Sequence, residues 1–304
     1  MNLNHESCFS DLINNEFDLS QFMGNQDKKI LYKAISESNI SDNDKSVEYR
    51  YNDNFFRSDN FISDHDGMHI LFSGCSESEG VGDIIENSWT NILYKKISKD
   101  VKCSGFFNLS RSGWGWSKIV INALIYFERY GYPDFYFIML PNHLRMHKFF
   151  SDGVKNNSGE IIGNWKYLQY YPQGYYNEKN KKDIILNGNS ENFAEEKEYK
   201  ENFIHFLNSW KLFNKICKDN GIRLIFSTWD TIDHDFIDST NIFNSFIKMP
   251  IKSKEFDDFV LQYYQDKKKS KHDIRKRDGH HGILFHNFWA DKFYDVYKME
   301  IDNA

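Results

Sequence analysis

The stretch His69-Ile70-Leu71-Phe72-Ser73-Gly74-Cys75-Ser76 decides the fold, because a short apolar segment runs straight into a Gly-Cys-Ser turn. A short apolar run that ends at a glycine is typical of a buried strand. Downstream, short apolar runs alternate with longer segments whose apolar residues recur at helical spacing. Strands separated by helices predict a parallel sheet, since every crossover returns through a covering element.

We therefore predict an α/β fold. Its sheet is doubly wound, flavodoxin-like and mostly parallel, and helices on both faces make a three-layer α/β/α sandwich. The predicted strands are residues 69–73, 105–109, 135–140 and 222–227. The predicted helices are residues 83–98, 115–130, 193–220 and 284–299.

The chain divides by composition at about residue 67. Residues 1–67 are polar, with one helix expected near 30–38 and a short strand at 47–51, and we interpret them as a flank packed on the core. Residues 68–304 form the main domain. Two long stretches, 146–190 and 230–271, lack its regular alternation. We expect these insertions to form lids and substrate walls.

Charge and composition exclude several classes of protein. The formal net charge of −6 gives no footprint for nucleic acid, and the basic run at 267–277 is interpreted as a solvated loop. The first residues lack a secretion signal and no window is apolar enough for a membrane span. The four cysteines are widely separated. We expect a cytoplasmic protein without disulfides, nucleic-acid partner or membrane contact.

Three residues have the types and order of a serine-hydrolase triad. Ser76 follows the first strand, and Asp278 precedes His281 by three positions near the C-terminus. In such a triad the serine attacks a carbonyl, the histidine takes its proton, and the aspartate stabilises the imidazolium. Singly, each residue has a plain alternative as a cap or turn residue. Together they predict acyl transfer.

Ligands of parallel sheets bind at the carboxyl ends of the strands, and further candidates follow the predicted strands there. An oxyanion needs preorganised donors. The backbone N–H groups of Ser76 and Gly113 and the side-chain amide of Asn142 are the candidate donors. Gly113 comes after the second strand, and Asn142 comes after the third.

These segments resemble the blocks of the SGNH hydrolases, also called the GDSL esterase and lipase superfamily. Gly74-Cys75-Ser76 is similar to the nucleophile block, Gly113 and Asn142 to the second and third blocks, and Asp278-Gly279-His280-His281 to the last. The segment Tyr51–Ser58 resembles the Asn-x-x-Gly-Phe-Arg motif of phage and bacterial members. A phage or viral source is compatible with this resemblance.

The chain departs from the family pattern at four positions. Cys75 replaces the aspartate of the first block, and Phe55 stands where the flank motif has glycine. Leu140 and His143 replace the glycine and aspartate around Asn142, so the third block rests on one residue.

The resemblance implies hydrolysis or transfer of a small acyl group without a cofactor. An O-acetyl group on a carbohydrate is the leading substrate, and a lipid ester is the alternative. A catalytically silent module that binds glycans or serves a structural role is the alternative from another class. The expected substrate-binding residues are Arg57, Trp114, His143 and His280. Trp114 and other aromatic residues could stack on sugar rings or pack in the core. The sequence leaves the oligomeric state open.

Two other chemistries are weighed against these assignments. Cys75 next to the turn could be a thiol nucleophile, but its side chain should point away from that of Ser76, which favours a buried structural thiol. The His280-His281 pair with Asp278, or Asp64-His65-Asp66 with His69, could ligate a metal. Neither has a spacing typical of a metal site, so we predict none.

Overall fold

The computed structural model describes most of the region after residue 50. The described residues are 50–81, 83–112, 114–141, 146–151, 154–155, 161–162, 165–170, 196–228, 237, 247 and 282–303. For 146–170 and 196–202 the description covers the backbone only. The helix expected near 30–38 lies outside these residues, and residues 50 and 51 belong to no strand.

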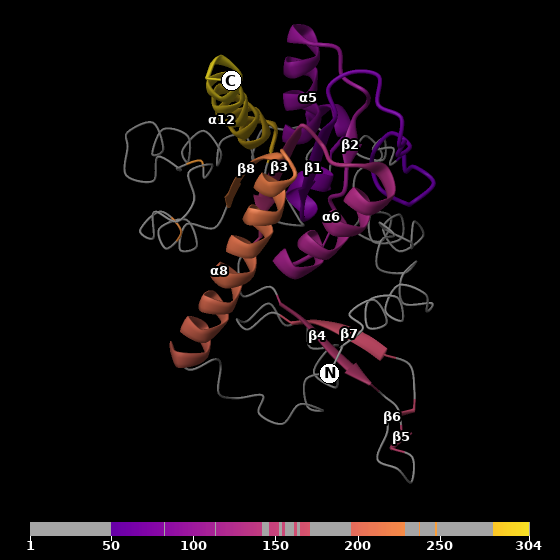
Figure 1. Cartoon of the computed structure of the whole chain (residues 1–304), viewed down its shortest axis with the longest axis vertical. Helices are drawn as coiled ribbons and strands as arrows, with labels where there is room; N and C mark the ends of the chain where they lie inside the picture. The colour runs from indigo at the N-terminus through magenta and orange to yellow at the C-terminus, as the bar shows by residue number, and fades with distance from the viewer. Residues whose placement is uncertain are drawn as a thin grey trace, which may run out of the picture.

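A parallel sheet forms the centre of the described region (Figure 1). Its four strands lie in the order β2-β1-β3-β8, which requires a crossover between β1 and β2 and another that returns past β1 to β3. The strands are β1 (Ile70–Gly74), β2 (Phe107–Asn108), β3 (Phe135–Leu140) and β8 (Arg223–Thr228). Every pair is parallel, so all carboxyl ends lie at one edge of the sheet.

Helices cover both faces of this sheet. Those in the described region are α4 (Ser76–Glu79), the 3-10 helix η2 (Ile85–Asn87), α5 (Trp89–Asp100), α6 (Trp116–Tyr130), α8 (Glu196–Asp219) and α12 (Ile283–Asp302). Apolar residues of α6 and α8 pack in one core cluster, and those of α5 and α12 pack in another. The predicted α/β fold with helices on both faces is confirmed.

Strand β3 shows why the sheet needs both layers. Its six residues are all buried, and alternate side chains enter opposite core clusters. Tyr136 packs against Phe127 of α6 and Phe213 of α8. On the other face, Phe137 contacts Phe293 of α12 edge-on. A strand that is apolar on both sides is stable only between two covering layers.

The element bounds differ from the predictions in places. The helix predicted at 83–98 is divided into η2 and α5, because Ser88 between them caps α5 by accepting a hydrogen bond from the Asn91 N–H. The insertion predicted at 146–190 contains strands of its own. Strand β4 (Met146–Ser151) pairs antiparallel with β7 (Trp165–Tyr170), and β5 (Val154–Lys155) pairs with β6 (Ile161–Ile162).

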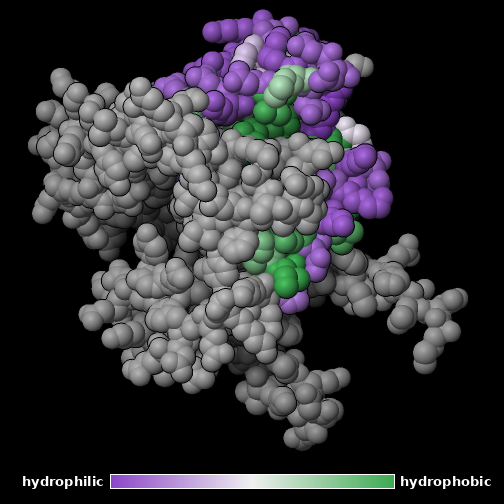
Figure 2. All heavy atoms as spheres, turned by 90° about the vertical axis from the view of Figure 1, so that its left-hand side faces the viewer, coloured by the Kyte–Doolittle hydropathy of each residue, from purple (hydrophilic) through white to green (hydrophobic). Residues whose placement is uncertain are grey.

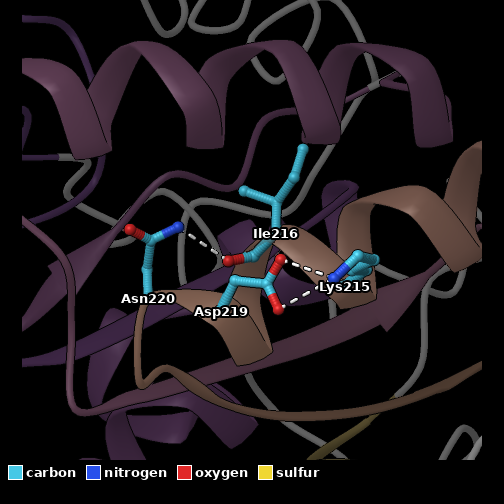
Figure 3. Close-up of polar contacts among 4 residues, drawn as sticks. All are labelled: Lys215, Ile216, Asp219 and Asn220. Atoms are coloured by element: carbon cyan, nitrogen blue, oxygen red, sulfur yellow. Dashed lines mark hydrogen bonds and ion pairs between the residues drawn. The ribbon is translucent and has the colours of Figure 1, made fainter.

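Helix α8 ends in a capped turn that feeds β8 (Figure 3). Gly221 has a φ of +73°, a conformation that suits glycine, and the Ile222 N–H returns to the Cys217 carbonyl at 2.9 Å. The Asn220 amide donates to the Ile216 carbonyl at 2.8 Å, and Lys215 pairs with Asp219 one turn apart. The chain therefore reverses tightly into the sheet, as Gly221 predicts.

On the face in Figure 2, hydrophilic residues dominate the described part, and hydrophobic ones show in small areas between them. Among the helices that the structure describes, none has the length and apolarity needed to cross a bilayer.

Candidate functional site

Ser76 begins helix α4 directly beyond the carboxyl end of β1. Its neighbour Cys75 is extended at φ −101° and starts the helix, and all four residues of α4 are buried. Gly74 makes the sharp entry possible, because an added Cβ would overlap Ser78 Oγ and lie 2.8 Å from the Met139 carbonyl oxygen. The turn therefore holds the serine close against the sheet edge.

Buried hydrogen bonds fix α4 from the neighbouring elements. The Trp89 indole of α5 donates to Ser78 Oγ at 3.1 Å, and the Asn108 amide of β2 donates to the Ser78 carbonyl at 3.0 Å. The Thr90 hydroxyl donates to the same carbonyl at 3.3 Å. A helix this short has little stability of its own, so these contacts hold its position.

Arg57 holds the other end of α4. Its guanidinium, which is 2% exposed, donates to the carbonyls of Glu79 at 3.3 Å, Gly80 at 2.5 Å and Asp83 at 2.7 Å. The Glu79 and Gly80 carbonyls lie at the C-terminal end of α4, where carbonyls lack intrahelical donors, and the Asp83 carbonyl lies in the connection that follows. The contacts assign Arg57 a structural role beneath the candidate site, and its predicted contact with substrate stays a prediction.

The loop before Arg57 contains a residue in the left-handed conformation. Phe55 has a φ of +60°, so it adopts the left-handed conformation at the position where the resemblance implies glycine. The Asn52 side chain stabilises this loop by accepting from the N–H groups of Asn54 and Phe56 at 3.0 and 2.9 Å. Phe56 is fully buried in the core. The backbone at Phe55 therefore adopts a conformation that glycine adopts more readily than phenylalanine.

The segment after β2 lies beside α4. The Arg111 N–H donates to the Gly74 carbonyl at 3.3 Å, and the Ser112 N–H donates to the Glu79 carboxylate at 2.5 Å. Gly113 itself lies outside the described residues. Trp114 is 3% exposed and contacts the Phe56 ring edge-on at 5.8 Å, so it packs in the core, the alternative to the predicted sugar contact.

Helix α12 runs antiparallel to the strands, which brings its start to the edge that holds Ser76. Tyr297 contacts Phe135 at the start of β3, while Phe293 contacts Phe137 further along that strand. The helix therefore begins, after Gly282, near the carboxyl ends. The predicted residues Asp278, His280 and His281 precede this start, and Asn142 and His143 follow the end of β3; all five lie outside the described residues.

Residues of the two alternative assignments also lie in the described part of the chain. Cys75 is buried, at 1% exposure, as expected for a structural thiol. His65 and His69 stack with ring centroids 3.5 Å apart, and His69 precedes β1 at the sheet edge opposite Ser76. Within the described part of the chain, no three His, Cys, Asp or Glu residues are grouped to hold a metal ion.

The sequence interpretation missed a buried lysine near this edge. Lys118 lies in the first turn of α6 and is 1% exposed. Burial and, to a smaller extent, the Arg111 charge lower the pKa of Lys118 to about 8. No sequence signal marks it, since it looks like an ordinary surface position of an amphipathic helix.

Comparison with known proteins finds no match: no family model fits the chain, and no curated protein or solved structure is similar to it. The site is therefore described by its own residues: a serine held at the carboxyl edge, a tight glycine turn, and basic side chains near them.

Proposed function

We propose that the chain is a serine ester hydrolase that removes or transfers a small acyl group, with O-acetylated carbohydrate as the leading substrate. The observation that carries the proposal is the position of Ser76, at the carboxyl end of β1 on a short helix that buried contacts fix in place. The extended Cys75 and the crowded Gly74 resemble a nucleophile turn. Phe55 adopts a φ typical of glycine at the position where the motif that Tyr51–Ser58 resembles has glycine, and this agreement also supports the proposal.

The proposed reaction uses the predicted triad. Ser76 Oγ attacks the ester carbonyl while His281 takes its proton, and Asp278 stabilises the imidazolium. The acyl C–O bond then breaks, and the departing alcohol takes the proton from His281. Water, activated by the same histidine, attacks the acyl-serine and releases the acid and free Ser76. Donors from Ser76, Gly113 and Asn142 would stabilise both oxyanions, each contributing about 2.7–4 kcal/mol.

A fluorophosphonate probe and a panel of ester substrates test this proposal. We expect wild-type protein to be labelled on the peptide that contains Ser76 and to hydrolyse short-chain esters, and Ser76→Ala to lose both properties. Ser73→Ala is the matched control, because Ser73 is a buried serine on β1 only three residues earlier. It should still be labelled.

Two results would redirect the proposal. Hydrolysis of long-chain esters in preference to acetyl esters would favour the lipid substrate. A folded wild-type protein that is neither labelled nor active on any ester would contradict the proposal and favour the silent binding module.

A further inference from the structure

The segment that follows β2 is tied to the turn that holds Ser76, on both sides of the serine. The Arg111 N–H donates to the Gly74 carbonyl at 3.3 Å, and the Ser112 N–H donates to the Glu79 carboxylate at 2.5 Å. Gly74 lies two residues before Ser76 in the chain, and Glu79 lies three residues after it. Arg111 and Ser112 are only partly buried, so the backbone that these contacts fix borders the solvent at the carboxyl edge of the sheet.

Glu79 provides the stronger of these two contacts. The residue is 1% exposed, and its backbone carbonyl accepts from the Arg57 guanidinium at 3.3 Å. A carboxylate that accepts from a backbone N–H makes a charge-assisted bond, which is shorter and roughly twice as strong as a bond between neutral groups. Asn108 adds a further link, because its amide donates to the Ser78 carbonyl and its oxygen accepts from the Ser110 N–H, both at 3.0 Å. Helix α4 and the segment after β2 therefore form one connected unit.

We propose that Glu79 is a positioning residue of this hydrolase: by fixing the Ser112 backbone beside α4, it holds the oxyanion donor of the same segment in register with Ser76. The inference rests on the proposed function, in which Gly113 supplies that donor. It adds a residue that neither the triad nor the set of oxyanion donors includes, and Glu79 itself takes no part in the proton transfers.

Covalent geometry links Ser112 to the predicted donor. The Gly113 N–H belongs to the peptide group that joins Ser112 to Gly113, and a peptide group is planar, so the placement of Ser112 limits where this N–H points. An oxyanion donor is effective at about 2.7–3.1 Å from the oxygen that becomes charged. A misplacement of about 1 Å lowers the rate by about a hundredfold. Loss of the Glu79 contact should therefore slow the chemical step and leave the ground-state binding of the ester nearly unchanged.

Steady-state kinetics on a short-chain acetyl ester such as p-nitrophenyl acetate test this role. We expect Glu79→Ala to lower kcat about a hundredfold with little change in KM. Glu79→Gln keeps an acceptor oxygen of the same reach without the charge, so its loss in kcat should be smaller, about tenfold. Glu128→Gln removes an exposed carboxylate of α6 and should match the wild type. A wild-type kcat in both Glu79 variants would overturn the inference even where Ser76 is the nucleophile. Glu79→Gln decides the question if Glu79→Ala does not fold.

Hydrogen exchange at the Ser112 amide separates this inference from the proposed function, because the measurement needs no catalysis. In NMR spectra of protein with isotope-labelled serine, we expect the Ser112 amide to be protected in the wild type and to exchange about tenfold faster in Glu79→Gln. The Ser104 N–H, which donates to the Met68 carbonyl at 3.0 Å near the opposite edge of the sheet, is the reference and should not change. If both amides behave so but no ester is hydrolysed, the positioning contact stands and the hydrolase proposal fails. A Ser112 amide that is unprotected in the wild type, or exchanges equally in both proteins, refutes the inference.

Discussion

Acid should destabilise this protein through His69, a buried histidine at the start of β1. Its ring is 3% exposed, and a hydrogen bond of 2.8 Å joins Nε2 to the Tyr126 hydroxyl. Burial is the main cause that lowers the pKa of His69 to about 3, and the charge of His65, whose ring stacks on it, is the second. The folded protein therefore keeps this ring neutral at pH values where the unfolded chain binds a proton.

The sign and size of the effect follow from linkage. With a pKa of 6.5 unfolded and about 3 folded, the neutral ring contributes fully above pH 6.5, and this contribution is lost as the pH falls toward 3. At pH 5 the unfolded state is favoured by about 2 kcal/mol relative to pH 7, and the complete loss is about 5 kcal/mol. Stabilities of ordinary domains are only about 5–15 kcal/mol, so the effect is large enough to measure.

Urea unfolding followed by circular dichroism at pH 7 and pH 5 measures this contribution. We expect His69→Gln, which keeps a hydrogen-bonding amide but cannot titrate, to lose about 2 kcal/mol less than wild type between the two pH values. His205→Gln replaces an exposed histidine of α8 and should follow the wild type. Equal pH dependence in wild type and His69→Gln would refute the reasoning, because the loss would then come from other groups.

Two further predictions concern the backbone around Ser76. Gly74→Ala should lower the free energy of unfolding by about 1–3 kcal/mol and abolish labelling by the fluorophosphonate probe, because the added Cβ would collide with Ser78 and Met139. Gly131→Ala is the control and should keep the labelling, because its Cβ would meet nothing within 4 Å. Phe55→Gly should be more stable than Phe55→Ala by about 1 kcal/mol in urea titrations, because the left-handed φ of +60° penalises alanine. If Phe55→Ala were the more stable of the two variants, the backbone at residue 55 would have relaxed out of the left-handed conformation.

Much of the sheet could be predicted because strong local patterns agree with the tertiary structure. Residues 135–140 form an unbroken apolar run, and β3 occupies the same six positions. Gly221 marks the end of α8 because few other residues adopt its left-handed conformation. Helix α4 was missed, since four residues are too few for a periodic pattern. The pair β4 and β7 was missed because its polar and aromatic composition resembles that of a connection.

The candidate site, too, could be predicted from the sequence only in part. Ser76 could be located because a strand followed by a Gly-x-Ser turn is a local feature of the sequence. The burial of Arg57 and Lys118 depends on which elements cover them, and a charged side chain in a sequence carries no sign that it will be buried. The left-handed Phe55 was hidden for a similar reason, because phenylalanine gives no local signal for a positive φ.

Several energetically costly features of the described residues lie next to helix α4. Phe55 holds an unfavourable φ, Gly74 leaves no room for a side chain, and Arg57 is a charged group removed from water. The core clusters on the two sheet faces are mostly ordinary apolar packing. Proteins keep local costs of this kind where geometry matters more than stability. A helix that only filled space could be replaced by simpler packing, whereas the proposed presentation of Ser76 as a nucleophile would require a helix held in a fixed place by these supports.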